Sequence, residues 1–491
     1  MNSKNESYPN ESELSRQWEE LTNKANKLKD NNKYFEAISL QKQALTVAQQ
    51  LWTKYKQPYL LANLNNLGFF YRDIGNYEEG IFYVQQALEI CQKSYPDENG
   101  MVALSLNALG SLYFCQGKYE EATPYIKKAL EIRQRLHLGD HPDLAISLND
   151  LGYVYFNQGK HEESAFYMKK SLEMQQRLHP DGHPHIVVGL NNLSILLRDI
   201  GNYKEGIFYV QQALEICQKL YPKRLYPNGH PNMAASLNAL GSLFSYQGKY
   251  EDAEPYHHQA LEMQRALYLK NHPEMAVSLN NLAFLYSIQG KYEDAIYCHQ
   301  QVLEICQDLY SSDHLMIAIS LNSLGQVYSS QGEYEKVEFY LQQSVKMLER
   351  LFKEDHPDIV VGLNNLGYLY WNQGKYEQAD SYYQQALKMQ QRIFPNAHPY
   401  TGTILNSLGC LCLDSKREKY EESASFLIQA LEIQQGLFPN GHRDIATILN
   451  NIGVFYLTFS QYEQAENFYK QSVNMLEKLF PDGHPEVATS L

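Results

Sequence analysis

One asparagine recurs along almost the whole chain at a nearly constant interval. It stands in the phrase Leu-Asn-x-Leu or Leu-Asn-x-Ile, and successive copies are 42 residues apart, except for one interval of 47 and one of 44. An asparagine amide offers one acceptor and two donors, which match the polar groups of any peptide backbone. A row of such amides can hold an extended segment, with a net ~1 kcal/mol from each hydrogen bond. The ten residues are Asn65, Asn107, Asn149, Asn191, Asn238, Asn280, Asn322, Asn364, Asn406 and Asn450.

Aromatic rings and two arginines recur four and seven residues after this asparagine. On a helix these offsets share one face, and aromatic residues and arginine are typical anchors for protein partners. Two interpretations stay open. The rings either contact a partner or fill space between repeats, and the asparagines either bind a peptide or tie one helix to the next. The residues at the two offsets are Phe69, Arg72, Phe114, Tyr153, Phe156, Arg198, Phe284, Tyr368 and Trp371.

A histidine also recurs once per repeat, eight residues before the asparagine and usually in front of a proline. Neighbouring helix layers lie ~10 Å apart, too far for two such histidines to share a metal ion. We therefore expect helix capping or loop packing, and we predict no metal site and no cofactor. The seven cysteines show no metal spacing, and we expect reduced, packed thiols. The histidines are His141, His183, His230, His272, His314, His356, His398, His442 and His484.

Several classes of protein are disfavoured by motif and charge. The chain has no glycine-rich phosphate loop, no HExxH, no GxSxG and no paired-cysteine motif, so we predict that it is not an enzyme. The net charge is −14, from 42 basic and 56 acidic residues, which argues against binding nucleic acid or an anionic membrane. No apolar stretch approaches the ~18 residues of a membrane span. The polar start MNSKNESYPNES lacks a signal peptide's apolar core, so we expect a cytoplasmic protein.

Each repeat must position these side chains on a pair of helices. In the unit that begins at His141, Pro142 suits the first turn of a helix because its missing N–H has no partner there. Leu148, Leu151 and Tyr155 follow at helical spacing. Gly159 ends this helix, and a second helix begins near His161. The pattern predicts an all-α, right-handed α-solenoid of about eleven antiparallel helix pairs.

The repeat resembles the tetratricopeptide repeat of the kinesin-light-chain type. The phrases LNNLGYLYWNQGKYEQAD, HPDLAISLNDLG and KKALEIRQRL carry the resemblance, which covers about residues 14–491. The resemblance implies that positions −3, 0, +4 and +7 from the asparagine face a concave groove. It also implies that the asparagine and the arginine of ALEIR hold cargo peptides. Only Arg133 keeps that arginine here.

These patterns predict the organisation and the function of the chain. We expect a disordered tail over 1–12, a divergent capping helix pair over 13–57, ten repeats over 58–483 and the start of an incomplete helix over 484–491. The expected function is a non-catalytic scaffold that binds a protein's peptide or helix in the concave groove. A regulatory or sensor arm of a larger signalling system is the alternative. A kinesin-type motor adaptor is less favoured because residues 1–57 show no sustained heptads. The sequence predicts no oligomeric state.

Overall fold

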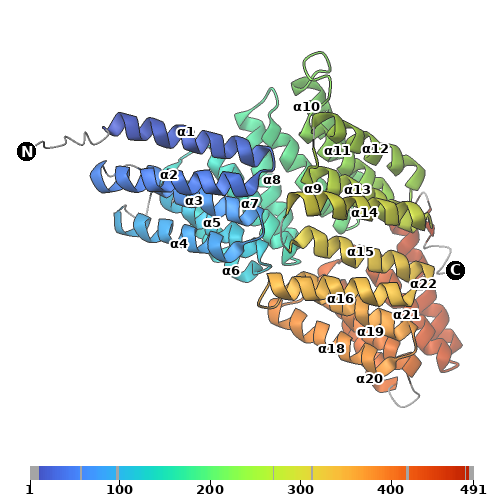
Figure 1. Cartoon of the computed structure of the whole chain (residues 1–491). Helices are drawn as coiled ribbons and strands as arrows, with labels where there is room; N and C mark the ends of the chain where they lie inside the picture. Colours follow the sequence, from blue (N-terminus) through green and yellow to red (C-terminus); the bar gives the residue numbers. More distant parts are fainter. Residues whose placement is uncertain are drawn as a thin grey trace, which may run out of the picture. The chain divides into compact units, whose positions relative to one another are not determined.

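Helices in adjacent pairs build the whole described chain (Figure 1). The computed structural model describes residues 10–55, 58–94, 99–268, 270–310, 313–415, 420–481 and 483–485. Within these ranges there are 22 α-helices and no strand, which confirms the predicted all-α class with eleven helix pairs. The helices form two compact units, residues 1–151 and 152–491.

The helix bounds follow the predicted repeat. The first unit holds α1 (Glu11–Asp30), α2 (Tyr34–Tyr55), α3 (Tyr59–Asp73), α4 (Tyr77–Ser94), α5 (Gly100–Cys115), α6 (Tyr119–Leu136) and the start of α7 (Pro142–Asn157). The second unit continues with α8 (His161–Leu178), α9 (Pro184–Asp199), α10 (Tyr203–Leu220), α11 (Pro231–Tyr246), α12 (Tyr250–Leu267), α13 (Pro273–Ile288), α14 (Tyr292–Leu309), α15 (Leu315–Gln331) and α16 (Tyr334–Leu351). It ends with α17 (Pro357–Asn372), α18 (Tyr376–Ile393), α19 (Pro399–Ser415), α20 (Tyr420–Leu437), α21 (Arg443–Thr458) and α22 (Tyr462–Leu479).

Glycine on the first helix of a pair lets the second helix approach closely. A Cβ added to Gly367 on α17 would lie 2.6 Å from the ring of Tyr383 on α18. One added to Gly68 on α3 would lie 2.3 Å from Val84 on α4. The side chain sixteen residues after the glycine therefore occupies the space that a Cβ would need, and its size differs from pair to pair.

A residue with positive φ joins the two helices of a pair. Gly159, Gly201 and Gly248 hold φ values of +73°, +80° and +76°, a conformation that glycine adopts without a Cβ penalty. In the last pair Ser460 takes this position with φ +60°. The predicted helix end at Gly159 is therefore confirmed, and the turn keeps one conformation while its sequence varies.

The repeated histidine caps the first helix. In His272 the ring Nδ1 accepts the backbone N–H of Glu274 at 3.3 Å, and the ring stacks on Tyr268 with centroids 3.6 Å apart. The expectation of capping is confirmed, because the same bond to the residue two positions on is made by His141, His183, His230, His314, His356, His398 and His442.

We predict that His272→Ala lowers the free energy of unfolding of the second unit by about 1 kcal/mol, the usual effect of losing an N-cap acceptor. His272→Asn is the matched variant, since asparagine caps well, and it should recover much of that loss. Urea unfolding followed by circular dichroism measures both. Equal stability of the alanine and asparagine variants would show that the cap contributes nothing.

The first helices of successive pairs touch one another and form the inner layer of each unit. Contacts join α3 to α5 in the first unit, and α9 to α11, α11 to α13, α15 to α17 and α19 to α21 in the second. No helix among the described residues is long and apolar enough to cross a membrane.

The segments predicted at the N-terminus and the C-terminus lie only partly within the described residues. Helix α1 begins at Glu11, two residues before the capping pair was expected, and it packs against α2 as a helix pair. Residues 1–9 of the predicted tail and residues 486–491 of the predicted incomplete helix lie outside the described residues.

Candidate functional site

A cavity of about 420 Å³ lies along the inner layer of the second unit, over α9, α11 and α13. It contains three of the residues predicted from the repeat, Asn191, Asn238 and Arg198. We call this cavity the inner groove. Its remaining lining is mainly amide, hydroxyl and small apolar side chains, from Val188, Asn192, Ser194, Ile195, Asn232, Ala235, Ala239, Ser242, Leu243, Gln264, Glu274, Val277 and Asn281.

A stack of three side chains runs from helix to helix beside the inner groove, and of the three only Arg198 lines the cavity itself. The guanidinium of Arg198 on α9 lies 4.8 Å from the ring centroid of Tyr246 on α11. Tyr246 in turn stacks on Phe284 of α13, with centroids 5.6 Å apart. Phe284 is 42% exposed, so one face of the stack is open to a partner. Arginine over an aromatic face is favourable, by about 0.5–2 kcal/mol according to burial.

The charge of Arg198 is balanced inside the protein. Its Nε donates to Asp199 Oδ1 at 2.6 Å, and the pKa of Arg198 is raised because the neighbouring carboxylate and rings outweigh burial, which alone would lower it. A ligand therefore meets a cation that is already paired. Shape and hydrogen bonding, more than net charge, are what this groove offers.

The repeated asparagines mostly bond to the next first helix. Asn191 donates to Ser236 Oγ at 3.0 Å and Asn238 donates to Ser278 Oγ at 2.7 Å. For Asn107, Asn322 and Asn406 the partner is instead the aspartate or asparagine that directly follows the asparagine of the next repeat. These bonds match the helix-tying interpretation, and they are Asn65–Ser105, Asn107–Asp150, Asn322–Asn365 and Asn406–Asn451.

Asn238 belongs to a buried polar chain behind the inner groove. Its Oδ1 faces Nδ1 of His257 at 3.1 Å, so the proton of that contact is assigned to the histidine. His257 is only 1% exposed, and burial lowers its pKa to about 4. Ser278, which accepts from Asn238, donates to Gln264 Oε1 at 2.6 Å. The oxygen and the nitrogen of the Asn238 amide each have a partner, so the side chain is held in one orientation.

A second cavity of about 410 Å³ lies further along the inner layer, over α15, α17 and α19. Tyr368, Asn364 and Asn365 line it, and Tyr368 is 47% exposed. Trp371 meets Tyr368 edge to face at 5.8 Å between centroids and donates from Nε1 to Asp414 at 2.9 Å. Of the two predicted rings of this repeat, Tyr368 lines the cavity and Trp371 contacts Tyr368.

The predicted arginines of the first unit are engaged within the protein. Arg133 is 6% exposed and bonds the backbone carbonyl of Asp143 at 3.2 Å and the hydroxyl of Ser147, so it fixes the start of α7 to α6. Arg72 donates to Ser111 at 3.0 Å and lies 5.2 Å over the ring of Phe69.

Three predicted rings pack beside the turns between paired helices. Phe114 lies 5.1 Å from Tyr119, and Phe156 lies 6.1 Å from both Tyr153 and His161. Tyr153 is 37% exposed. Asn149, Asn280 and Asn450 keep the repeated position on α7, α13 and α21. None of these residues lines the inner groove as the structure describes it.

Sequence reasoning missed Tyr246, Glu274 and the serines that accept from the asparagines. Tyr246 stands eight residues after Asn238, outside the offsets that were considered. The serines do carry a signal, because Ser105, Ser236 and Ser278 each stand two residues before a repeated asparagine.

A helix-pair array with a polar inner groove is the class that this fold defines. The family model for the tetratricopeptide repeat matches residues 59–134, 101–177, 150–219, 186–266, 232–305, 274–350, 358–419 and 414–478. The chain belongs to the tetratricopeptide repeat family. No sequence among the curated proteins matches it.

Solved structures match this chain at low identity. A Rap protein complexed with Competence and Sporulation Factor is 15% identical, with 78% of this chain and 99% of that chain covered and a TM-score of 0.52. The TPR-like repeats of a putative kinesin light chain from Podosopora anserina are 20% identical over 42% of this chain and 96% of that chain, with a TM-score of 0.37. BtubC (BKLC) from P. vanneervenii is 20% identical over 48% and 92%, with a TM-score of 0.41.

Proposed function

We propose that this chain is a non-catalytic, cytoplasmic scaffold that binds an extended segment of a partner protein in the inner groove. The observation that carries the proposal is the stack of Arg198, Tyr246 and Phe284 across three helices, open at the Phe284 ring. A segment lying across α9, α11 and α13 would meet the polar lining of the groove and, beside it, an exposed aromatic ring, the residue type enriched at binding hot spots.

The asparagines have a narrower role in this proposal than the sequence predicts. The amide nitrogens of Asn191 and Asn238 already donate to serines, so these residues shape the groove wall more than they grip a backbone. Asn281 and Asn232 also line the groove. The partner segment would supply an apolar side chain for the Phe284 ring and backbone groups for these amides.

The experiment is a selection of random-library peptides on the purified full chain, followed by fluorescence anisotropy with the best peptide. Phe284→Ala should weaken binding at least tenfold, or about 1.4 kcal/mol, because an exposed aromatic anchor is lost. The fold should be unchanged, since the ring is exposed.

Phe208→Ala is the matched control, because Phe208 is also a half-exposed phenylalanine but lies on a second helix, α10. It should bind the peptide like the wild type. Equal affinity of wild type and Phe284→Ala would place the peptide elsewhere and reject the inner groove as its site. The alternative of a regulatory arm has no observation in its favour beyond the shared fold.

A further inference from the structure

Three side chains that can bind a metal ion meet in the loop between α6 and α7 of the first unit. His137 directly follows α6, His141 directly precedes α7, and Asp143 lies in the first turn of α7. Each offers one ligand atom, and these three atoms lie within 4.8 Å of one another. Across the described part of the chain, no other group of three histidine, cysteine, aspartate or glutamate side chains meets this limit. We call these three residues the loop triad.

The prediction of no metal site depends on the distance between repeats. Two histidines from neighbouring helix layers ~10 Å apart cannot share an ion. In the loop triad a second histidine, His137, stands four residues before His141 in the same loop. All three ligands therefore come from one loop, and the distance between repeats does not separate them.

Ring stacking alone does not require a histidine at position 137. His137 stacks on His141 with centroids 3.5 Å apart, and Phe352 stacks in the same way on His356 at 3.6 Å. These aromatic rings supply the stack without a nitrogen atom, so the imidazole of His137 adds a metal ligand that packing does not need. Tyrosine or phenylalanine takes this place, four residues before the histidine, at Tyr268, Tyr310, Phe352, Phe394, Phe438 and Phe480.

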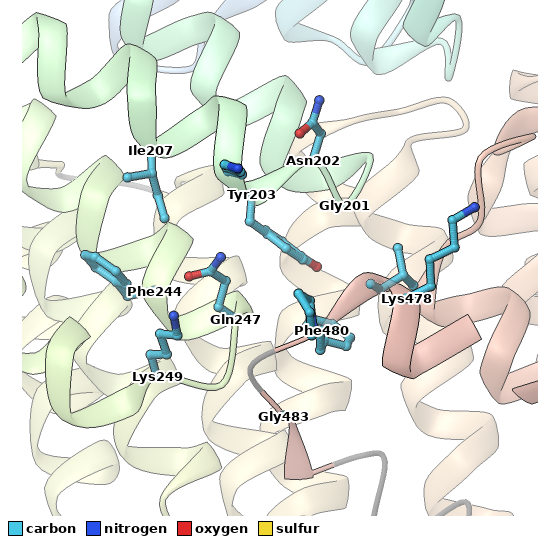
Figure 2. Close-up of a pocket in the computed structure, with 13 residues that line it drawn as sticks. Gly201, Asn202, Tyr203, Ile207, Phe244, Gln247, Lys249, Lys478, Phe480 and Gly483 are labelled. Carbon is cyan, nitrogen blue, oxygen red and sulfur yellow. The ribbon is translucent and has the colours of Figure 1, made fainter. Parts of the chain in front are cut away.

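The phenylalanine at this position in the last helix pair also packs against another pair. Phe480 stacks on Tyr203 of α10 with centroids 5.7 Å apart, and Figure 2 shows the two side chains pointing toward one another. His137 has a different environment, because it is partly exposed and, within the described residues, stacks only on His141. Its ring can therefore turn toward an ion with the loss of one ring contact.

The ligand set of the loop triad is one that zinc uses. Two imidazoles and one carboxylate hold zinc in open sites at about 2.0–2.2 Å, and water takes the fourth position. Nδ1 of His141 lies 3.9 Å from Oδ2 of Asp143, and two ligands of one tetrahedral zinc ion lie ~3.4 Å apart at such bond lengths. The side chain of Asp143 is 54% exposed and free to move by this difference. His137 must tilt out of its stack so that its lone pair converges with that of His141.

An ion bound to His141 would replace the cap of α7. Nδ1 of His141 accepts the backbone N–H of Asp143 at 3.2 Å. A neutral imidazole has one lone pair, so a ring that gives it to an ion at either nitrogen cannot also accept that N–H.

Arg133 gives the start of α7 a second attachment. It bonds the backbone carbonyl of Asp143 and the hydroxyl of Ser147, so α7 stays tied to α6 when the cap is released. The positive charge of Arg133 also acts on Asp143 and opposes an ion there. We therefore expect a dissociation constant in the micromolar range.

We propose that the loop triad binds a divalent transition-metal ion such as Zn²⁺ and that the ion replaces the hydrogen bond that His141 accepts from α7. Ion binding loosens the first turn of α7 while Arg133 keeps the helix in place. The site lies in the first unit, so the proposal is independent of the inner groove in the second unit.

Isothermal titration calorimetry of the full chain with zinc chloride tests the site. Wild type should bind zinc in the micromolar range, and His137→Phe should bind at least about tenfold more weakly, because a ligand is lost. Phenylalanine keeps the ring stack, as Phe352 does on His356. The variant should therefore melt at the same temperature as the wild type when a chelator is present.

His179→Phe is the matched control. His179 holds the same position in the next loop and stacks on His183 at 4.0 Å, but the side chains of that loop do not meet the 4.8 Å limit. This variant should bind zinc like the wild type. Hydrogen exchange of the peptide over 141–147 measures the cap, and zinc should speed that exchange in the wild type but not in His137→Phe.

Three results would overturn the proposal. One is a wild type that binds no zinc at micromolar concentrations. Another is a zinc affinity that His137→Phe leaves unchanged, or that His179→Phe lowers as much, since the ion would then lie elsewhere. The third is exchange over 141–147 that zinc does not change in the wild type, which would show that His141 keeps its cap and does not hold the ion.

Discussion

Acidification from pH 7 to pH 5 is expected to remove much of the stability of the second unit. Burial lowers the pKa of His257, His299 and His398 from the ordinary 6.5 to about 4. The same lowering to about 4 applies to His161 and His314, and His356 falls to about 3. These rings are neutral in the folded chain and become charged only when it unfolds.

The direction in which the free energy of unfolding changes with pH follows from proton binding. The unfolded chain takes up a proton on each histidine near pH 6.5, whereas the folded chain does so only near pH 4. Between these values the unfolded chain binds more protons, so the free energy of unfolding falls as pH falls. Each histidine contributes up to about 1.4 kcal/mol per pH unit. Asp358, whose pKa burial raises to about 6, acts in the opposite direction and offsets about one histidine.

Urea unfolding at a series of pH values between 7 and 4 measures this slope. His299→Leu is the matched variant, because His299 Nδ1 is buried without a hydrogen-bond partner in the described chain and leucine fills the equivalent place at Leu341. The variant should unfold with a shallower pH dependence than wild type, by about 1.4 kcal/mol per pH unit. A urea midpoint of the wild-type chain that does not change between pH 7 and pH 5 would contradict the expectation.

Truncation of Tyr383 is expected to have the largest effect of any single core substitution considered. Tyr383 is fully buried and its ring fills the space over Gly367. Tyr383→Ala should lower the free energy of unfolding by about 3–5 kcal/mol, because the neighbouring helices close only partly over the cavity.

Two comparisons test the cause of that loss. Tyr383→Val should cost less than alanine, since valine is the natural residue over the equivalent glycine at Val84 and Gly68. Phe339→Ala removes a ring of similar size that is 54% exposed on α16, and it should change stability by no more than about 0.5 kcal/mol. A loss for Tyr383→Ala that is no greater than for Phe339→Ala would mean that the space over Gly367 collapses freely.

The sequence by itself determined the helix pairs and their ends. These features depend on signals within one repeat, such as the helical spacing of Leu148 and Leu151, the positive φ at Gly159 and the cap at His272. Each signal depends on a few consecutive residues, so it can be recognised in the sequence without knowing which helices pack against one another.

Tertiary structure decided what the repeated polar residues do. Asn191 and Asn238 both stand in the phrase Leu-Asn-x-Leu, and each depends on a serine of the next repeat for its hydrogen bond. Arg133 and Arg198 were both candidates for the groove, but only Arg198 lines it, because Arg133 is enclosed between α6 and the start of α7. The contact between the end of α9 and the loop before α21 depends on small rotations accumulated over six helix pairs. The residues of one repeat do not determine this total rotation. The contact between His442 and Asp199 therefore could not be predicted from the sequence.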